Sequence, residues 1–289
     1  MVDLSRRAAL ATAVIGAASA NLTAAQAQPR ANLAGYAVNL DCWFRDVPFE
    51  QRFKLARQAG FQTIEFWRAR RAPDLDAAAI RRLADENGLV VEQFAPEWPR
   101  FSDPGQHDTL VKTIEAAIAD AKILDCTQFT LVGHHIVDGM TREAMIAGYT
   151  TGLMRIAPML EAAGVTALVE PFNTVNHLNH LLNGSQPAYA MVKSVNSPRV
   201  KLLWDFYHMQ LEEGDLIQKF KTGFDQVGYI QIGDVPGRHE PGTGEINHAN
   251  LIHAIRANGY KGKIGLEFMP LLDNWRAAVK AVAGLDTSG

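Results

Sequence analysis

The sequence of 289 residues has little cysteine, no large excess of charge of one sign and no apolar run long enough to cross a membrane. Its two cysteines exclude a disulfide-stapled scaffold and a four-cysteine zinc site. The formal net charge of −3 lacks the basic surplus of a nucleic-acid-binding protein, so we expect no nucleic-acid partner. What remains is an ordinary globular composition, 47% hydrophobic and 20% charged, with enough length for one large α/β domain.

Residues 1–27 contain the three parts of an export signal in the expected order. Arg6-Arg7 is a twin-arginine pair, the apolar run Ala8–Ala20 follows it, and Ala25-Gln26-Ala27 is a small-x-small cleavage site. The apolar run is too short to span a bilayer. We therefore predict a twin-arginine-type signal peptide over 1–27, a periplasmic mature protein over 28–289 and no membrane association after signal removal. The alternative is an N-terminal extension of another kind.

From Leu33 onward, short runs rich in Val, Ile, Leu and Phe alternate with stretches of helical periodicity. The predicted strands are Gly35–Asp41, Phe61–Phe66, Leu89–Phe94, Gln128–Val132, Thr166–Glu170, Lys201–Asp205, Gly228–Ile232 and Lys263–Phe268. The predicted helices include Glu50–Gln58, Leu75–Asn87, Thr109–Leu124, Arg142–Ala162 and Ala249–Asn258. Several of these helices are followed by a glycine where a left-handed C-cap is expected, such as Gly60 and Gly164.

This alternation predicts the fold class. Parallel neighbouring strands need a crossover connection, which a helix between consecutive strands supplies. Eight such units in a chain of this length predict a single-domain (β/α)8 TIM barrel over 28–289. The runner-up is a doubly wound open sheet, which would normally show a glycine-rich phosphate turn after the first strand. The segment Asn39–Trp43 is not such a turn.

Four consecutive predicted strands carry a polar side chain at or near their carboxyl ends: Glu170, Asp205, Gln231 and Glu267. In this barrel class the carboxyl ends of the strands form the active site. Buried carboxylates are costly unless they are paired or bound to metal, and we expect no lysine to neutralise them here. Three carboxylates and one amide oxygen suit Mg²⁺ or Mn²⁺ better than zinc. The alternative is that each is an isolated ion-pair or capping residue of a polar rim.

Four motifs carry a further signal: Val169-Glu170-Pro171, Asp205-x-x-His208, the stretch from Gln231 to Glu245, and Gly265-Leu266-Glu267-Phe268. In this order they resemble the hydroxypyruvate isomerases, within the xylose isomerase-like barrels that include tagatose and psicose epimerases. The resemblance runs from Tyr36 to Trp275. It implies that the metal is held by Glu170, Asp205, Gln231 and Glu267. It also implies that Glu170 and Glu267 transfer the proton, and that His208 and Arg238 contact substrate oxygens.

Other side chains leave the predicted strands at the same end of the barrel. We predict that Trp43, after the first strand, and His134, after the fourth, contact the substrate; packing in the core or rim is the alternative. Further candidates, each with an ordinary surface or packing role as its alternative, are Glu65, Trp67, Glu97, Trp98, His177 and His180.

These expectations combine into a function. The chain is predicted to be a metal-dependent isomerase of a small 2-hydroxy-carbonyl sugar or sugar acid, in which glutamates move a proton through an ene-diolate. A ketose 3-epimerase or a sugar dehydratase on the same scaffold is one alternative. A non-catalytic periplasmic sugar-binding protein is an alternative of another class. No strong basic cluster marks a phosphate site, so we expect an unphosphorylated small molecule as partner, and the resemblance also leaves a homo-oligomer open.

Overall fold

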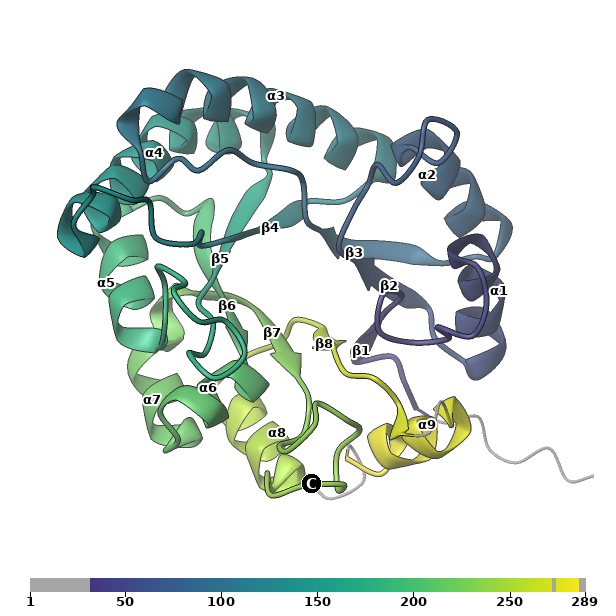
Figure 1. Ribbon diagram of the computed structural model, residues 1–289. Helices are drawn as coiled ribbons and strands as arrows, with labels where there is room; N and C mark the ends of the chain where they lie inside the picture. Colours follow the sequence, from purple (N-terminus) through teal and green to yellow (C-terminus); the bar gives the residue numbers. More distant parts are fainter. Residues whose placement is uncertain (1–31, 272–273, 286–289) are drawn as a thin grey trace, which may run out of the picture. The chain divides into compact units, whose positions relative to one another are not determined.

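The computed structural model describes residues 32–271 and 274–285, and the predicted export signal over 1–27 lies outside them. Eight parallel strands close into one barrel in the order of the sequence, each hydrogen-bonded to its sequence neighbours and the last to the first (Figure 1). The strands are β1 (Tyr36–Asn39), β2 (Thr63–Phe66), β3 (Val90–Phe94), β4 (Gln128–Val132), β5 (Thr166–Glu170), β6 (Val200–Asp205), β7 (Val227–Ile232) and β8 (Ile264–Leu266). The predicted (β/α)8 TIM barrel is therefore confirmed.

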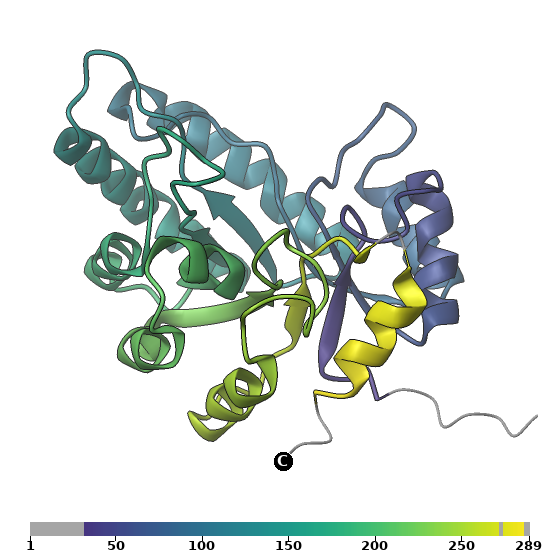
Figure 2. The same ribbon diagram turned by 60° about the horizontal axis from the view of Figure 1, so that its bottom comes forward.

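Helices surround this barrel in a ring (Figure 1). They are α1 (Phe49–Ala59), α2 (Ala77–Glu86), α3 (His107–Leu124), α4 (Arg142–Ala163), α5 (Ser185–Val195), α6 (Phe206–Glu212), α7 (Leu216–Gly223), α8 (His248–Ala257) and α9 (Trp275–Ala283), with short 3₁₀ turns at Pro104–Gln106 and Phe224–Gln226. Figures 1 and 2 both place α9 near β1, where the barrel closes. Within the described ranges, no helix has the length and apolar character needed to span a membrane.

Local sequence signals explain where these elements begin and end. Gly60 and Gly164 cap α1 and α4 with φ of 103° and 69°, the left-handed conformation expected of a C-cap glycine. The first strand stops two residues before its predicted end. The side-chain oxygen of Asn39 accepts the backbone N–H of Asp41 at 2.9 Å, which turns the chain away from the sheet.

The barrel interior has an apolar floor below a polar layer. Leu168, Leu203 and Tyr229 form a small buried cluster of their own. The larger apolar core fills the space between the strands and the surrounding helices. Inside the barrel, buried polar side chains from several strands are hydrogen-bonded to one another, with Glu65 of β2 at their centre. This layer supports the functional site.

Candidate active site

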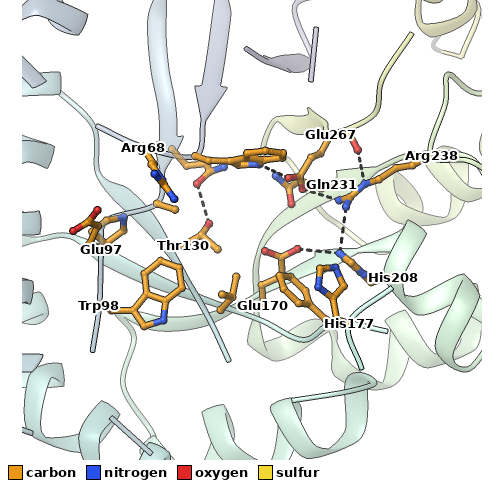
Figure 3. Close-up of a pocket in the computed structure, with 16 residues that line it drawn as sticks. Arg68, Glu97, Trp98, Thr130, Glu170, His177, His208, Gln231, Arg238 and Glu267 are labelled. Carbon is orange, nitrogen blue, oxygen red and sulfur yellow. Dashed lines mark hydrogen bonds and ion pairs between the residues drawn. The ribbon is translucent and has the colours of Figure 1, made fainter. Parts of the chain in front are cut away.

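A cavity of about 560 Å³ lies at the carboxyl ends of the strands, where the barrel fold places catalytic sites. Ten of its lining residues are labelled in Figure 3. The lining residues are Trp67, Arg68, Gln93, Ala95, Pro96, Glu97, Trp98, Thr130, Val132, Glu170, Phe172, His177, His208, Gln231, Arg238 and Glu267. The cavity thus contains three of the four predicted metal ligands, and Asp205 lies behind Arg238, fully buried.

Two of the three carboxylates, Asp205 and Glu267, share one cation, which is Arg238. Its Nη2 atom donates to Asp205 Oδ2 at 2.5 Å and to Glu267 Oε2 at 2.9 Å. Its Nε atom also donates to the Glu267 backbone carbonyl at 2.8 Å. The expectation that the carboxylates need a metal because nothing else compensates them was therefore too strong. An arginine from the loop after β7 provides one positive charge against three acidic side chains.

Asp234 holds the loop that carries Arg238. Its carboxylate accepts backbone N–H bonds from Val235, Gly242, Gly244 and Ile246 at 2.9–3.1 Å. A Cβ atom at Gly244 would meet the Val235 carbonyl oxygen at 2.0 Å, so only glycine fits there. Within the motif from Gln231 to Glu245, Asp234 and Gly244 thus stabilise the loop rather than contact the substrate.

Burial dominates the electrostatics of the acidic group. Desolvation raises the pKa of Glu170 well above its usual range, and the charges of Glu267 and Asp205 raise it further. Desolvation also raises the pKa of Glu267 to about 8, against the opposing effect of Arg238. Desolvation likewise raises the pKa of Asp205, and the charge of Arg238 opposes this rise. Desolvation lowers the pKa of Arg238. The negative charges of Glu267 and Asp205 have a larger combined effect, and the net result is a raised pKa.

His208 is a neutral imidazole with a defined tautomer. Burial, and then the charge of Arg238, lower its pKa well below its usual range. Asn173 donates from Nδ2 to His208 Nδ1 at 2.6 Å, and the Asn176 backbone N–H donates to Asn173 Oδ1 at 2.8 Å, which fixes the Asn173 amide. The bond from Asn173 assigns the proton of His208 to Nε2, which lies 3.5 Å from Arg238 Nη1, 3.6 Å from Asp205 Oδ2 and 3.8 Å from Glu170 Oε1.

Gln231 provides the test of whether the site fits a metal. Its Nε2 atom donates to Glu65 Oε1 at 2.8 Å, whereas its buried Oε1 atom has no hydrogen-bond partner among the described residues. An unpartnered buried amide oxygen is costly unless a ligand satisfies it. Ligand atoms of Glu170, Asp205 and His208 also lie within 4.8 Å of one another. The carboxylates and the Gln231 oxygen therefore fit a divalent cation, and the imidazole of His208 lies beside them.

Two aromatic residues that were weaker candidates line the cavity. Trp67 is 43% exposed, and its Nε1 atom donates to Glu267 Oε1 at 2.5 Å. Trp98 forms part of the wall on the far side of the cavity from Glu267 (Figure 3). His177 also lines the cavity, with its ring centroid 4.2 Å from that of Phe172. Glu97 is at the rim, while Glu65 is buried inside the barrel and does not line the cavity.

The structure does not bring Trp43 and His134 to the cavity wall. Trp43 is fully buried, donates from Nε1 to the Leu266 carbonyl at 3.2 Å and packs edge-on against Phe61. His134 Nε2 accepts the Ser102 backbone N–H at 3.2 Å. Both rings have partners within the protein, so neither is placed to contact a substrate in the cavity.

Among the polar and aromatic lining residues, sequence reasoning missed Arg68, Gln93, Thr130 and Phe172. Each lies at or just beyond the carboxyl half of a strand, so strand-end placement could have found them. Gln93 and Thr130 lie within predicted strands rather than after them. In the structure, Thr130 Oγ1 donates to Gln93 Oε1 at 2.8 Å, so the two form part of the polar layer.

Comparisons with known proteins identify the family. A family profile described as xylose isomerase-like TIM barrel matches residues 53–284. The chain is 33% identical to a 2-oxo-tetronate isomerase of Cupriavidus necator, over 81% of this chain and 92% of the relative. It is 29% identical to the hydroxypyruvate isomerase of Escherichia coli, over 81% and 93% respectively.

Solved structures show the same fold. A Brucella melitensis protein described as a family 2 AP endonuclease is 31% identical, with a TM-score of 0.75, over 82% of this chain and 93% of that one. A D-psicose 3-epimerase from Clostridium cellulolyticum H10 aligns with a TM-score of 0.72 at 18% identity, over 88% and 98%. The relatives with curated names are isomerases, which confirms the resemblance predicted from the motifs. The chain belongs to the xylose isomerase-like TIM barrel family.

Proposed function

We propose that this isomerase is metal-dependent and moves a carbonyl group between adjacent carbons of a small 2-hydroxy-carbonyl sugar or sugar acid. The observation that carries the proposal is the pair Glu170 and Glu267, two buried glutamates with raised pKa that line one cavity together with the unpartnered oxygen of Gln231. The relatives named 2-oxo-tetronate isomerase and hydroxypyruvate isomerase support a hydroxy-oxo acid as the substrate class.

Glu170, Asp205, Gln231 and Glu267, with His208 close by, are the residues that would hold Mg²⁺ or Mn²⁺. When bound, such a cation polarises a carbonyl and favours negative charge on its oxygen. Asp205 accepts the Tyr207 backbone N–H at 2.8 Å, as the N-cap of α6, which fixes its side chain. Arg238 occupies the space between Asp205 and Glu267, and we expect it to stay there as a cation that opposes the rise of their pKa on burial.

The two glutamates differ in how firmly the protein holds them. Both oxygens of Glu267 accept hydrogen bonds, from Trp67 and from Arg238. The Glu170 carboxylate makes no hydrogen bond of 3.5 Å or less with a described residue, and His208 Nε2 lies 3.8 Å from its Oε1 atom. We therefore assign to Glu170 the removal of the proton from the carbon next to the carbonyl. Glu267 returns a proton at the neighbouring carbon, and His208 Nε2–H donates to a substrate oxygen.

Solvent exchange in D₂O tests this assignment. Metal-loaded protein is incubated with hydroxypyruvate, 2-oxo-tetronate and a panel of ketoses, and NMR follows deuterium entering the carbon next to the carbonyl. We expect metal-dependent exchange that is lost in Glu170→Gln and Glu267→Gln and kept in Glu86→Gln, the same change at an exposed residue of α2 that does not line the cavity. Absence of exchange at full metal occupancy would refute the function. Inversion at a carbon without movement of the carbonyl would identify an epimerase instead.

We also propose that residues 1–27 export the protein to the periplasm. The order of the twin-arginine pair, the apolar run and the cleavage site supports this. Cell fractionation of the wild type and of a variant with Arg6→Lys and Arg7→Lys tests it. We expect the variant to stay in the cytoplasm, and an unchanged distribution would refute the proposal.

A further inference from the structure

The two ends of the cavity differ in chemistry. Glu170, His208, Arg238 and Glu267 lie at one end, and Arg68, Glu97 and Trp98 lie at the other, with Thr130 between them (Figure 3). The proposed proton transfer uses only the first end. The second end therefore needs an explanation of its own.

Arg68 is an unpaired cation at this second end. Three arginines follow β2 in the segment Trp67-Arg68-Ala69-Arg70-Arg71. Arg70 is paired with Asp120 at 2.6 Å, and Arg71 with Asp41 at 2.5 Å. Arg68, which makes no ion pair or hydrogen bond with a described residue, is the one of the three that lines the cavity. Its charge is thus available to a ligand, whereas Arg238 is engaged by two carboxylates.

The cavity has room for a substrate longer than hydroxypyruvate. At about 30 Å³ for each water-sized heavy atom, the seven heavy atoms of hydroxypyruvate would fill only about 210 Å³. The cavity has about 560 Å³, and Trp67 and Trp98 give it aromatic walls of the kind that pack against sugar rings. A six-carbon sugar acid, with about thirteen heavy atoms, would fill roughly 390 Å³ on the same basis.

We propose that Arg68 binds the carboxylate of a sugar acid whose acid group lies several bonds away from the two carbons that exchange the carbonyl, as in a hexuronate. The inference rests on the proposed function, because the reacting carbons must lie between Glu170 and Glu267. A guanidinium binds a carboxylate through two parallel hydrogen bonds. Glu97, at the same rim, is positioned to accept hydrogen bonds from sugar hydroxyl groups.

The test compares Arg68→Gln with Arg70→Gln, which removes the same charge two residues along the chain at a residue that does not line this cavity. Deuterium exchange is measured with a hexuronate, an uncharged ketohexose and hydroxypyruvate. We expect Arg68→Gln to lower kcat/KM for the hexuronate roughly 10- to 100-fold and to change the ketohexose less than about threefold. Arg70→Gln should change neither. An equal effect of Arg68→Gln on the charged and uncharged sugars would overturn the proposal.

Calorimetry separates this result from the proposed function. Binding of the hexuronate is measured to Glu267→Gln protein, with and without Arg68→Gln. Weaker binding in the double variant supports the role of Arg68 even where no turnover occurs. Unchanged binding overturns it, whereas failure of exchange in the wild type overturns the isomerase assignment alone.

A second inference rests on a different residue, the fully buried Glu65. Its carboxylate accepts four hydrogen bonds. The donors are Tyr229 Oη at 2.6 Å, Gln231 Nε2 at 2.8 Å, Asn39 Nδ2 at 3.1 Å and Gln93 Nε2 at 3.3 Å. Glu65 therefore accepts a hydrogen bond from the side-chain nitrogen of Gln231, and the side-chain oxygen of Gln231 has no partner among the described residues.

The geometry points to Glu65 as a positioning residue that sets the orientation of the Gln231 amide for metal binding. Without a carboxylate at this position, nothing in the polar layer requires the Gln231 nitrogen to face inward. Gly265 makes the arrangement fit, because a Cβ atom there would lie 2.6 Å from Glu65 Oε2 and 2.7 Å from Gln231 Cγ.

Titration calorimetry with Mn²⁺ tests this role. Glu65→Gln introduces an amide donor that competes with the Gln231 nitrogen, and we expect Mn²⁺ affinity to fall by about 10- to 100-fold. The control, Tyr229→Phe, removes the bond to Glu65 Oε2 and leaves the Gln231 bond to Oε1, so affinity should stay within about threefold. Equal affinity of Glu65→Gln and wild type, or equal loss in Tyr229→Phe, would overturn the inference. A wild type that binds no Mn²⁺ would instead refute the metal.

Discussion

Replacement of Arg238 by Met should destabilise the metal-free protein strongly at alkaline pH. Arg238 bridges Asp205 and Glu267 at 2.5 and 2.9 Å, and these carboxylates are almost completely buried. Breaking a buried ion pair by removing one partner costs about 3–5 kcal/mol, because the remaining charge has no compensation. At a slope of about 3 kcal/mol/M, this lowers the urea midpoint by about 1–2 M.

The pH dependence of this loss follows from Glu267. Its pKa is about 8 in the folded protein, mainly because of burial, and lies above its ordinary value. Because the pKa of this carboxyl group is higher in the folded than in the unfolded protein, its protonation stabilises the folded state. This contribution to the free energy of unfolding is lost as pH rises from about 4.5 through 8. The penalty of Arg238→Met should therefore be larger at pH 8.5 than at pH 6, where a proton can replace the missing charge.

Urea unfolding followed by tryptophan fluorescence, in EDTA at both pH values, measures the effect. Arg238→Lys, which keeps the charge, serves as the control and should retain most of the stability. Added Mn²⁺ should restore part of the loss in Arg238→Met, since a dication can compensate the same carboxylates. An Arg238→Met protein as stable as the wild type in EDTA at pH 8.5, or one with equal losses at both pH values, would refute the reasoning.

Three further predictions concern other parts of the fold. Gly148→Ala in α4 should lower the free energy of unfolding in urea by at least about 2 kcal/mol despite the better helix propensity of alanine, because the Cβ would lie 2.0 Å from the Ser102 carbonyl oxygen. Burial lowers the pKa of His134 to about 4, so between pH 7 and pH 5 the wild type should lose about 2 kcal/mol more stability than His134→Gln, measured by urea unfolding in EDTA. Trp67→Phe removes a hydrogen-bond donor to Glu267, so the pKa of Glu267 should rise. Deuterium exchange should then slow about tenfold, and its pH profile should shift to higher pH.

Strand positions could be predicted from the sequence because strands buried on both faces carry continuous apolar runs. The ends of β4 and β5 match the prediction residue for residue, and Glu170 was recognised because it follows directly on such a run. Glu267 and Gln231 were found by the same logic. These signals are local in the sequence, and the barrel fold brings the side chains together at the carboxyl end of the strands.

Contacts between distant segments could not be predicted in this way. The bond from Trp67 to Glu267 joins residues 200 positions apart, and nothing in either segment specifies it. Arg238 reaches the carboxylates from a loop position with φ of 58°, which sequence reading assigned to substrate contact rather than to charge compensation. Trp43 was placed at the rim by its strand-end position. The turn at Asn39 instead directs it under β8, where its N–H meets the Leu266 carbonyl.

The buried carboxylate of Glu65 also bears on how the chain folds. It lies on β2, yet its two shortest hydrogen bonds come from Tyr229 and Gln231 on β7, more than 160 residues later. A fragment ending after β4 would contain this charge without those donors and would have to expose it to water or protonate it. The two halves of the barrel are therefore expected to be poor independent folding units. Native structure should appear late and cooperatively, once the seventh strand has joined the second across the barrel interior.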